Sequence, residues 1–451
     1  MKPRVSHIAV QASWPFKGLN TLLPPNALDS GFNVLGSNVL IRDGYAIRRQ
    51  GYTNFGSLGA TAPLMLLRDF EGIDGLRHLV AATTKKQYSY DDVSGTWSDI
   101  STIGGDWTGN EFNHIQSAIG LDATSKRLML VNGLDTPVEW DGTGVFTDVT
   151  WNLPNFVTCK AIAVYKDYLV IGNIVTTENE TQLIAWSDTA DFSEFVAGNS
   201  GIATIADIVG SIQALIPLGD RLIIYTTDSI AVMSFVGGSI LFSFETVMQN
   251  TSMLSPTAIV NLGYAHLYAG GENIYLFDGT NNLIPIGDAI KNTYRATLDL
   301  SQASKTHVVH DPVKREIFWF IPNTSTTFKC FHMGYDVQNL ANPRWAILDF
   351  ADVFRASGIF IEDQSLRWNS TELAGIEWST ELYSWSSTRR VSTVPDLVLG
   401  SLDGEVFKSE TTDTTDAGTA IASYWDTIDF TVPESFMSTQ GRWIEIEAEL
   451  A

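Results

Sequence analysis

Cysteine is nearly absent from this chain, which has only Cys159 and Cys330 among its 451 residues. Apolar or aromatic residues flank both of them, a setting typical of buried thiols rather than of a disulfide. The sequence therefore excludes a fold held together by a cysteine framework, and packing must supply the stability.

Long hydrophobic runs are also missing. No segment approaches the roughly 20 apolar residues that a membrane-spanning helix needs. The first residues lack the apolar core of a secretory signal peptide. The sequence therefore predicts no membrane span and no secretory signal, and we expect the chain to be made and folded in a cytoplasm.

Basic side chains are scarce. The chain has 28 Lys and Arg against 51 Asp and Glu, a net charge of −23. Such a surface repels a phosphate backbone, which argues against tight, static binding of DNA or RNA. The charge still permits transient passage of DNA that must not adhere.

Motifs for catalysis, cofactors and metals are lacking as well. The sequence has no phosphate loop, no Gly-x-Ser-x-Gly elbow and no His-Glu-x-x-His. His307 and His310 form a close pair, but positions three apart on a strand face opposite sides, which disfavours a shared zinc ion. Residues 89–97 look like the Asp-box of sialidase-type propellers, with Asp and Gly out of register by two positions. We therefore expect no catalytic, cofactor-binding or metal-binding residues, and a protein that is not an enzyme.

The sequence is rich instead in short apolar strands separated by turn residues. Residues 265–286 contain three such strands, bounded by Gly, Asn and Asp, the residues that accept the positive φ of hairpin turns. Residues 128–146 and 221–242 repeat the pattern. A β-meander that recurs every 40–50 residues or so is typical of a β-propeller.

Six meander units can be placed between residues 61 and 350. The sequence thus predicts an all-β chain with a β-propeller of about six blades at 61–350. Residues 1–60 are interpreted as an N-terminal platform part that includes a hairpin across Asp43 and Gly44. Residues 351–451 are interpreted as a C-terminal β-rich platform or dock part with a hairpin at 397–407.

Two further elements are predicted outside the meanders. Residues 288–294 fit a short helix with Asp288 as its N-cap. Residues 441–451 alternate as a half-exposed strand. Either this strand closes a sheet with residues 35–50, or the native polypeptide continues and is truncated here at residue 451.

Several short motifs resemble a known family. Residues 24–34, 38–44 and 48–52 resemble the opening of bacteriophage virion proteins in which a β-propeller follows. Residues 219–230 and 263–290 are similar to the propeller of tail hub proteins of short-tailed phages, also called nozzle, tail accessory factor or tail tubular proteins. Residues 400–407 and 416–427 resemble a sequence motif that recurs in phage tail proteins. The resemblance spans roughly 20–430.

This resemblance implies a structural protein of the virion tail that is synthesised in the cytoplasm of a host bacterium. In the family, six copies form a hexameric ring below the portal or adaptor proteins, tail fibres or spikes dock on it, and double-stranded DNA leaves through its channel during genome ejection. Family members are commonly longer and have a distal tip, so the resemblance leaves the tip, the gate, the host and the fibre partner unassigned.

An acidic channel wall would suit this function, because a wall that repels phosphate does not retain passing DNA. Asp403, Glu405, Glu445 and Glu447 are the candidate channel-lining residues. The alternative is that the acidity serves solubility only.

Two other functions remain open from the sequence. A glycan-cleaving propeller would need carboxylates and arginines gathered on one face. A carbohydrate-binding or scaffold propeller could use the 13 Trp and 14 Tyr as stacking platforms, and it should remain monomeric. The same aromatic residues also suit packing between blades or an interface between subunits.

Overall fold

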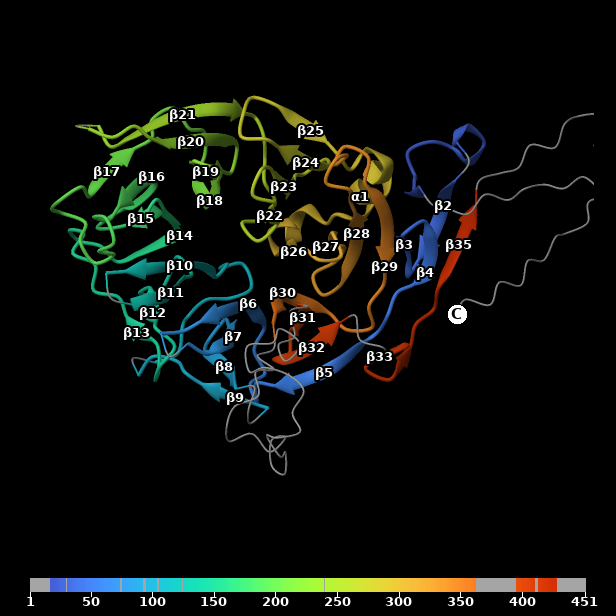
Figure 1. The fold of residues 1–451 in the computed structure, drawn as a ribbon, viewed down its shortest axis with the longest axis horizontal. Helices are drawn as coiled ribbons and strands as arrows, with labels where there is room; N and C mark the ends of the chain where they lie inside the picture. Colours follow the sequence, from blue (N-terminus) through green and yellow to red (C-terminus); the bar gives the residue numbers. More distant parts are fainter. Residues whose placement is uncertain are drawn as a thin grey trace, which may run out of the picture.

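The computed structural model describes residues 17–427 except 30, 74, 92–94, 104, 124, 239, 362–394 and 410–412. Its main body is a ring of four-stranded antiparallel sheets, a β-propeller (Figure 1). Blade 1 contains β6 (Leu64–Glu71), β7 (Arg77–Thr83), β8 (Gln87–Asp91) and β9 (Thr96–Asp99). Blade 2 contains β10 (Gln116–Asp122), β11 (Ser125–Val131), β12 (Val138–Trp140) and β13 (Thr147–Asp148). Blade 3 contains β14 (Thr158–Tyr165), β15 (Tyr168–Val175), β16 (Asn179–Trp186) and β17 (Gly201–Thr204).

The next three blades repeat this order. Blade 4 contains β18 (Ile212–Leu218), β19 (Arg221–Thr226), β20 (Ser229–Phe235) and β21 (Phe242–Gln249). Blade 5 contains β22 (Ile259–Asn261), β23 (His266–Ala269), β24 (Ile274–Phe277) and β25 (Leu283–Pro285). Blade 6 contains β26 (His307–Asp311), β27 (Glu316–Pro322), β28 (Phe328–Gly334) and β29 (Arg344–Leu348). These six sheets are the six meander units that the sequence predicts.

A seventh sheet completes the ring. It begins with β30 (Phe354–Phe360), β31 (Asp396–Ser401) and β32 (Glu405–Ser409), and its fourth strand is β5 (Tyr52–Ser57) from the other end of the chain. The sheet ends in β33 (Thr415–Asp416) and β34 (Thr419–Ala420). The predicted boundaries at residues 60 and 350 therefore need correction, because they assign the strands of this blade to the two platform parts.

The inner strands close the ring. β30 of blade 7 lies against both β26 of blade 6 and β6 of blade 1. Gly358 permits the second contact, because a Cβ at this position would lie 2.6 Å from the Leu67 carbonyl oxygen. β5 and β32 come from before and after the other blades. Because they pair in one sheet, opening the ring would break the hydrogen bonds between them, which costs free energy. No local pattern in the sequence indicates that these two distant segments pair.

The remaining strands form a side unit that projects from the ring beside blade 6 (Figure 1). β1 (Gly18–Leu19), β2 (Phe32–Ser37) and β35 (Tyr424–Thr427) make a three-stranded sheet. β3 (Val39–Arg42) and β4 (Tyr45–Arg48) form the predicted hairpin, with Asp43 and Gly44 both at positive φ in its two-residue turn. The side unit thus joins segments from before and after the propeller. The predicted strand at 441–451 lies outside the described residues.

Helix is sparse, as predicted. η1 (Pro25–Ala27) is a single turn, η2 (Asp288–Ile290) leads into α1 (Lys291–Thr297), and η3 (Leu300–Lys305) precedes blade 6. The prediction that Asp288 caps the helix is wrong, because its carboxylate instead accepts a hydrogen bond of 2.7 Å from the Asn273 side chain. None of the helices in the described part of the chain is long and apolar enough to cross a membrane.

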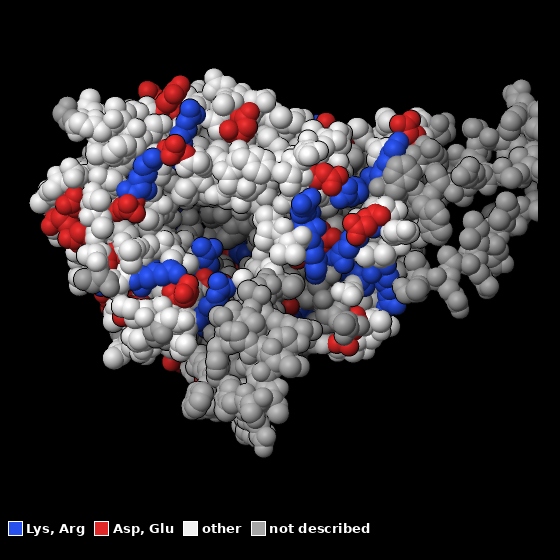
Figure 2. All heavy atoms as spheres, viewed as in Figure 1, with Lys and Arg blue, Asp and Glu red and all other residues white. Residues whose placement is uncertain are grey.

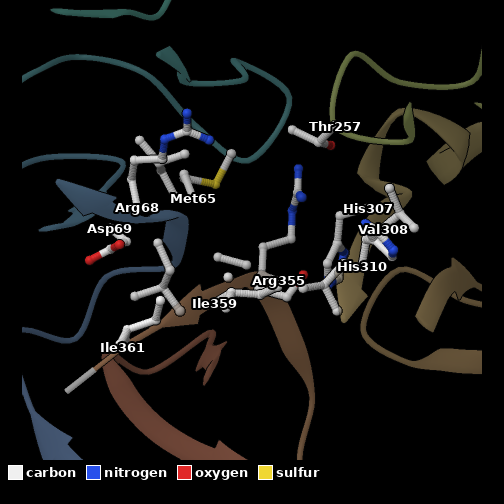
Figure 3. A pocket seen from close by; sticks show the side chains of 16 residues that line it. Met65, Arg68, Asp69, Thr257, His307, Val308, His310, Arg355, Ile359 and Ile361 are labelled. Carbon is white, nitrogen blue, oxygen red and sulfur yellow. The ribbon is translucent and has the colours of Figure 1, made fainter. Parts of the chain in front are cut away.

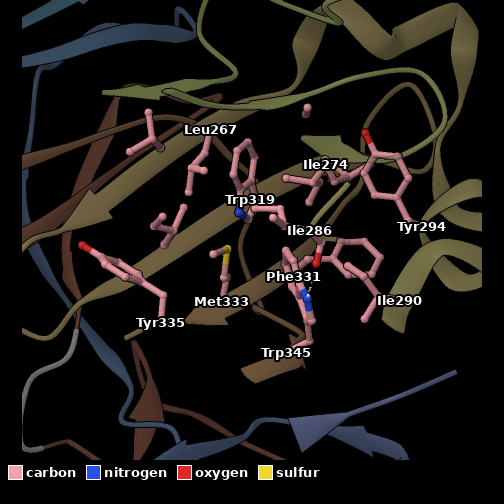
Figure 4. Packing of buried hydrophobic residues seen from close by; sticks show 14 of the residues in the cluster. Leu267, Ile274, Ile286, Ile290, Tyr294, Trp319, Phe331, Met333, Tyr335 and Trp345 are labelled. Atoms are coloured by element: carbon pink, nitrogen blue, oxygen red, sulfur yellow. Dashed lines mark hydrogen bonds between the residues drawn. The ribbon is translucent and has the colours of Figure 1, made fainter. Parts of the chain in front are cut away.

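Large buried side chains fill the spaces between blades. Between blades 5 and 6, Trp319, Phe331 and Trp345 pack with Leu267 and Ile274 (Figure 4). The indole of Trp345 also donates a hydrogen bond of 3.2 Å to the Ile286 carbonyl. Several of the aromatic residues thus serve packing between blades. Cys159 and Cys330 are both buried and free, which confirms the prediction of buried thiols.

Candidate functional site

A cavity of about 530 Å³ lies between the inner strands of blades 1, 6 and 7. β6, β26 and β30 supply most of its lining, and Thr257, just before β22, completes it (Figure 3). The space-filling view shows a hollow at the centre of the ring with Lys and Arg side chains at its edge (Figure 2). Such a gathering of cations is unexpected in a chain with a net charge of −23.

Arg355 is the more deeply buried of the two arginines that line the cavity. It lies on β30 with 1% of its surface exposed, and its guanidinium extends into the cavity (Figure 3). Two of its donors reach the carbonyl oxygens of Glu111 and Lys305, at 2.6 and 3.3 Å. Its Nε has no hydrogen-bond partner among the described residues. Burial lowers the pKa of Arg355 to about 10, so it is still a cation at neutral pH.

Two buried histidines accompany Arg355. The ring of His307 stacks on Phe320 with centroids 4.6 Å apart, and its Nδ1 lies 3.4 Å from the Lys305 carbonyl oxygen. Burial and the charge of Arg355 lower the pKa of His307 to about 3. The same two influences, with smaller ones from Lys160 and His307, lower the pKa of His114 well below its ordinary value. Both imidazoles are therefore neutral at pH 7.

His310 also lines the cavity, but it makes different contacts from His307. Its Nε2 lies 2.7 Å from the Tyr335 hydroxyl, whereas His307 stacks on Phe320. The two histidines face opposite sides of β26, as the sequence predicts. In the described part of the chain, no group of three or more His, Cys, Asp and Glu side chains is placed to hold a metal ion.

Arg68 enters the cavity from β6, next to β30 (Figure 3). Its side chain is exposed, yet desolvation by the surrounding protein lowers its pKa. It makes no hydrogen bond or ion pair to any described residue. The neighbouring carboxylate of Asp69 lies 3.3 Å from Arg77, and that of Glu111 lies 2.7 Å from Lys305. The cavity thus has two guanidinium groups whose charges are not neutralised by a direct ion pair.

Arg68 and Arg355 were not singled out from the sequence. Each stands inside an apolar inner strand, within Leu64–Glu71 and Phe354–Phe360. Burying a charged side chain in an apolar strand costs free energy unless an interaction compensates for it. An arginine inside an apolar strand is therefore the pattern by which the sequence could have indicated these two residues.

Residues 48–52, one of the segments that resemble virion proteins, contribute Arg49 to a buried ion pair. Arg49 and Asp416, 367 residues apart, form an almost fully buried ion pair with two hydrogen bonds of 2.5 and 2.7 Å. Arg49 also donates to the side chain of Asn38, at 2.7 Å, and its guanidinium lies 4.4 Å above the Phe350 ring. Asn38 in turn donates to the Ala422 carbonyl at 2.7 Å. We call these residues the joint, because they tie the side unit to the end of blade 6, to β33 of blade 7 and to the segment that follows it.

A second buried ion pair lies next to the joint. Arg42 of the hairpin donates two hydrogen bonds to Glu316 of β27, at 2.6 and 2.7 Å. His332 lies 3.3 Å from the same carboxylate. Burial alone would raise the pKa of Glu316, but His332 and Arg42 together hold it well below its usual range. The N-terminal hairpin is thus fixed to blade 6 by charge as well as by packing.

The predicted channel-lining residues are only partly within the described structure. Asp403 is exposed in the turn between β31 and β32, and Glu405 is the first residue of β32. The Glu405 carboxylate accepts a hydrogen bond of 2.9 Å from Asn54 on β5. Neither lies on an inner strand, so they do not line the hollow of the propeller itself. Glu445 and Glu447 lie outside the described residues.

The side unit exposes large apolar residues. Leu35 on β2 and Tyr424 on β35 have 49% and 50% of their surface exposed. The register pairs Leu35 with Asp426 and Ser37 with Tyr424, which makes Leu35 and Tyr424 diagonal neighbours on one face of the sheet. Tyr45, Leu22 and Leu23 are also exposed on this unit. We call the face of this sheet that carries Leu35 and Tyr424 the side surface.

Comparison with known proteins finds similarity in overall shape only. No protein-family model and no curated protein matches the sequence. The WD40 domain of Neurospora crassa Pan2 is 9% identical with a TM-score of 0.43, over 80% of this chain and 95% of that one. Two structures of the extracellular domain of a two-component or one-component system from B. thetaiotaomicron are 10% and 12% identical, with TM-scores of 0.41 and 0.42. They match over 79% and 80% of this chain, which spans only 39% and 40% of their length.

Proposed function

We propose that this chain is a tail hub subunit of a bacteriophage virion, and that several copies assemble through the side surface into a ring around a DNA channel. The observation that carries the proposal is the side unit itself. It lies outside the closed propeller and exposes two neighbouring apolar residues, Leu35 and Tyr424, on one face of its sheet. Exposed apolar residues gathered on one face are features of surfaces that associate.

A second copy of this chain is the partner that fits this surface. The joint fixes the side unit rigidly to the propeller through the buried Arg49–Asp416 pair, so the angle between the two parts is set. A rigid, off-centre contact surface that meets a different surface of an identical neighbour generates a closed ring when the rotation closes. The resemblance of the sequence to tail hub proteins supports six copies, docked on portal or adaptor proteins and carrying fibres or spikes.

The side surface can be tested by measuring mass in solution. We expect the double change Leu35→Asp and Tyr424→Asp to weaken association at least about 100-fold, since charged groups would replace two interface side chains. Light scattering across a concentration series measures this. The double change Leu300→Asp and Val236→Asp is the control, since these residues are 74% and 60% exposed but lie elsewhere. If both double variants assemble equally well, the side surface does not mediate the association.

The acidic turn of blade 7 gives a separate prediction. Asp403→Lys with Glu405→Lys changes the net charge of the chain from −23 to −19, since each reversal adds two positive charges. If these residues face the channel of the ring, the variant ring should retain double-stranded DNA at about 50 mM salt and release it steeply as salt rises.

Gel-shift and filter-binding titrations against salt measure this retention. The matched control reverses Glu178 and Glu180, which are exposed on blade 3. DNA binding that is the same in both variants would show that Asp403 and Glu405 do not face the channel, and that the acidity acts only through net charge.

A carbohydrate-binding or glycan-cleaving propeller is the other candidate, and the cation-lined cavity is the one feature that favours it. This alternative function predicts a monomer that binds or cleaves a glycan. A monodisperse monomer in the same light-scattering experiment would favour it over the ring.

A further inference from the structure

We propose that the central cavity binds a small molecule with more than one oxyanion group, carboxylate or phosphate, between Arg68, Arg355 and His307. All three side chains line the same cavity of about 530 Å³ (Figure 3). This volume is within the range of small-molecule sites. The inference does not depend on the assembly proposed above.

The hydrogen-bonding capacity of the cavity points to an anion. A guanidinium has five N–H donors, and Arg355 uses two of them on the carbonyl oxygens of Glu111 and Lys305. Its Nε and the Nε2 of His307 have no partner among the described residues, although both side chains are at least 97% buried. The Nε of Arg355 is a buried donor without a partner, which is costly, and an anion in the cavity would satisfy it. The neutral ring of His307 carries its proton on Nδ1, which faces the Lys305 carbonyl, so its Nε2 would accept a hydrogen bond from a hydroxyl or protonated acid group of the ligand.

The charged side chains around the cavity also favour an anionic ligand. Arg68 and Arg355 enter from the neighbouring strands β6 and β30, and Lys160 adds a third half-buried cation near His114. The carboxylates nearby are already engaged, Asp69 with Arg77 and Glu111 with Lys305. Among the described residues, neither guanidinium is neutralised by a direct ion pair, so both would attract an anion that enters the cavity. Guanidinium groups bind carboxylate and phosphate in bidentate geometry, so two of them favour a ligand with two or more such groups.

Arg68→Gln and His307→Phe are the informative variants. Arg68 makes no hydrogen bond or ion pair within the described structure, so its loss should leave the fold intact. Phe at position 307 keeps a flat ring against Phe320 and removes the unpartnered nitrogen. Arg295→Gln and His78→Phe are the matched controls, because they make the same chemical changes on α1 and on β7, away from the cavity lining.

The test is titration of the full chain with citrate and with inorganic phosphate at constant ionic strength, by calorimetry and by the shift in Tm. We expect saturable binding of at least one probe, a rise in Tm on saturation, and an affinity about 10- to 100-fold lower in Arg68→Gln and His307→Phe. Tighter binding of citrate would identify the ligand as a polycarboxylate, and tighter binding of phosphate as a phosphate ester. Both controls should bind as the unmodified chain does.

Two results would overturn the proposal. One is the absence of saturable binding for both probes. The other is equal stabilisation of the unmodified chain, Arg68→Gln and His307→Phe, which would show a general salt effect. The Tm of each variant without ligand shows directly whether it has folded.

Discussion

Replacing Arg49 with Met is expected to lower the free energy of unfolding by about 3–5 kcal/mol, because it leaves the carboxylate of Asp416 buried without its partner. Asp416 is 3% exposed, so water cannot take the place of the guanidinium. Asn38 and the Asp349 carbonyl would lose their hydrogen bonds to Arg49 as well. Calorimetric and urea unfolding measure the loss.

Two further variants make the interpretation specific. Arg295→Met removes an exposed ion pair with Glu272 and should cost less than about 1 kcal/mol. The double variant Arg49→Met, Asp416→Leu should be more stable than Arg49→Met alone, because it no longer buries an unpaired charge. Strictly additive losses in the double variant would show that the two residues do not act as a pair.

Acid is expected to destabilise the protein well above the pH at which carboxylates titrate. Burial lowers the pKa of His266 to about 4, and burial with Arg355 lowers that of His307 to about 3. The unfolded chain, with histidine pKa values of about 6.5, binds more protons than the folded chain below that pH. Stability is therefore complete above pH 6.5 and is lost progressively as the pH falls toward 4 and 3.

The expected loss between pH 6.5 and pH 4 is on the order of 5 kcal/mol for the two residues together. Glu316 extends it to lower pH, because its lowered pKa contributes stability that is present above about 4.3 and is lost as the pH falls further. Urea midpoints measured across this range in chloride buffer give the slope. His266→Gln should reduce the slope only in part, because the buried His307 and His114 also have lowered pKa values and still contribute. An unchanged slope in that variant would contradict the assignment.

The sequence predicts the repeating part of this fold well, because each blade from β6 to β29 is a local meander. Alternation of apolar residues and the Gly, Asn and Asp turns are short-range signals. The hairpin around Asp43 and Gly44 and the buried thiols of Cys159 and Cys330 are confirmed for the same reason. Each of these features depends on neighbours in the sequence.

Features that depend on distant residues could not be predicted in this way. Blade 7 pairs Tyr52–Ser57 with Glu405–Ser409, and the joint pairs Arg49 with Asp416. The cation-lined cavity likewise brings Arg68 and Arg355 together only when the ring closes. The acidic side chains of Asp403 and Glu405 indicate positions that contact water, but no local pattern says what the surface around them faces.

The most direct test of the proposed function is negative-stain imaging of the purified chain, alone and with candidate phage portal or adaptor proteins. The proposal predicts a ring with six-fold symmetry and an open centre, formed by the chain alone or on the adaptor. A monodisperse monomer that binds none of these proteins would contradict it and would favour a ligand-binding propeller.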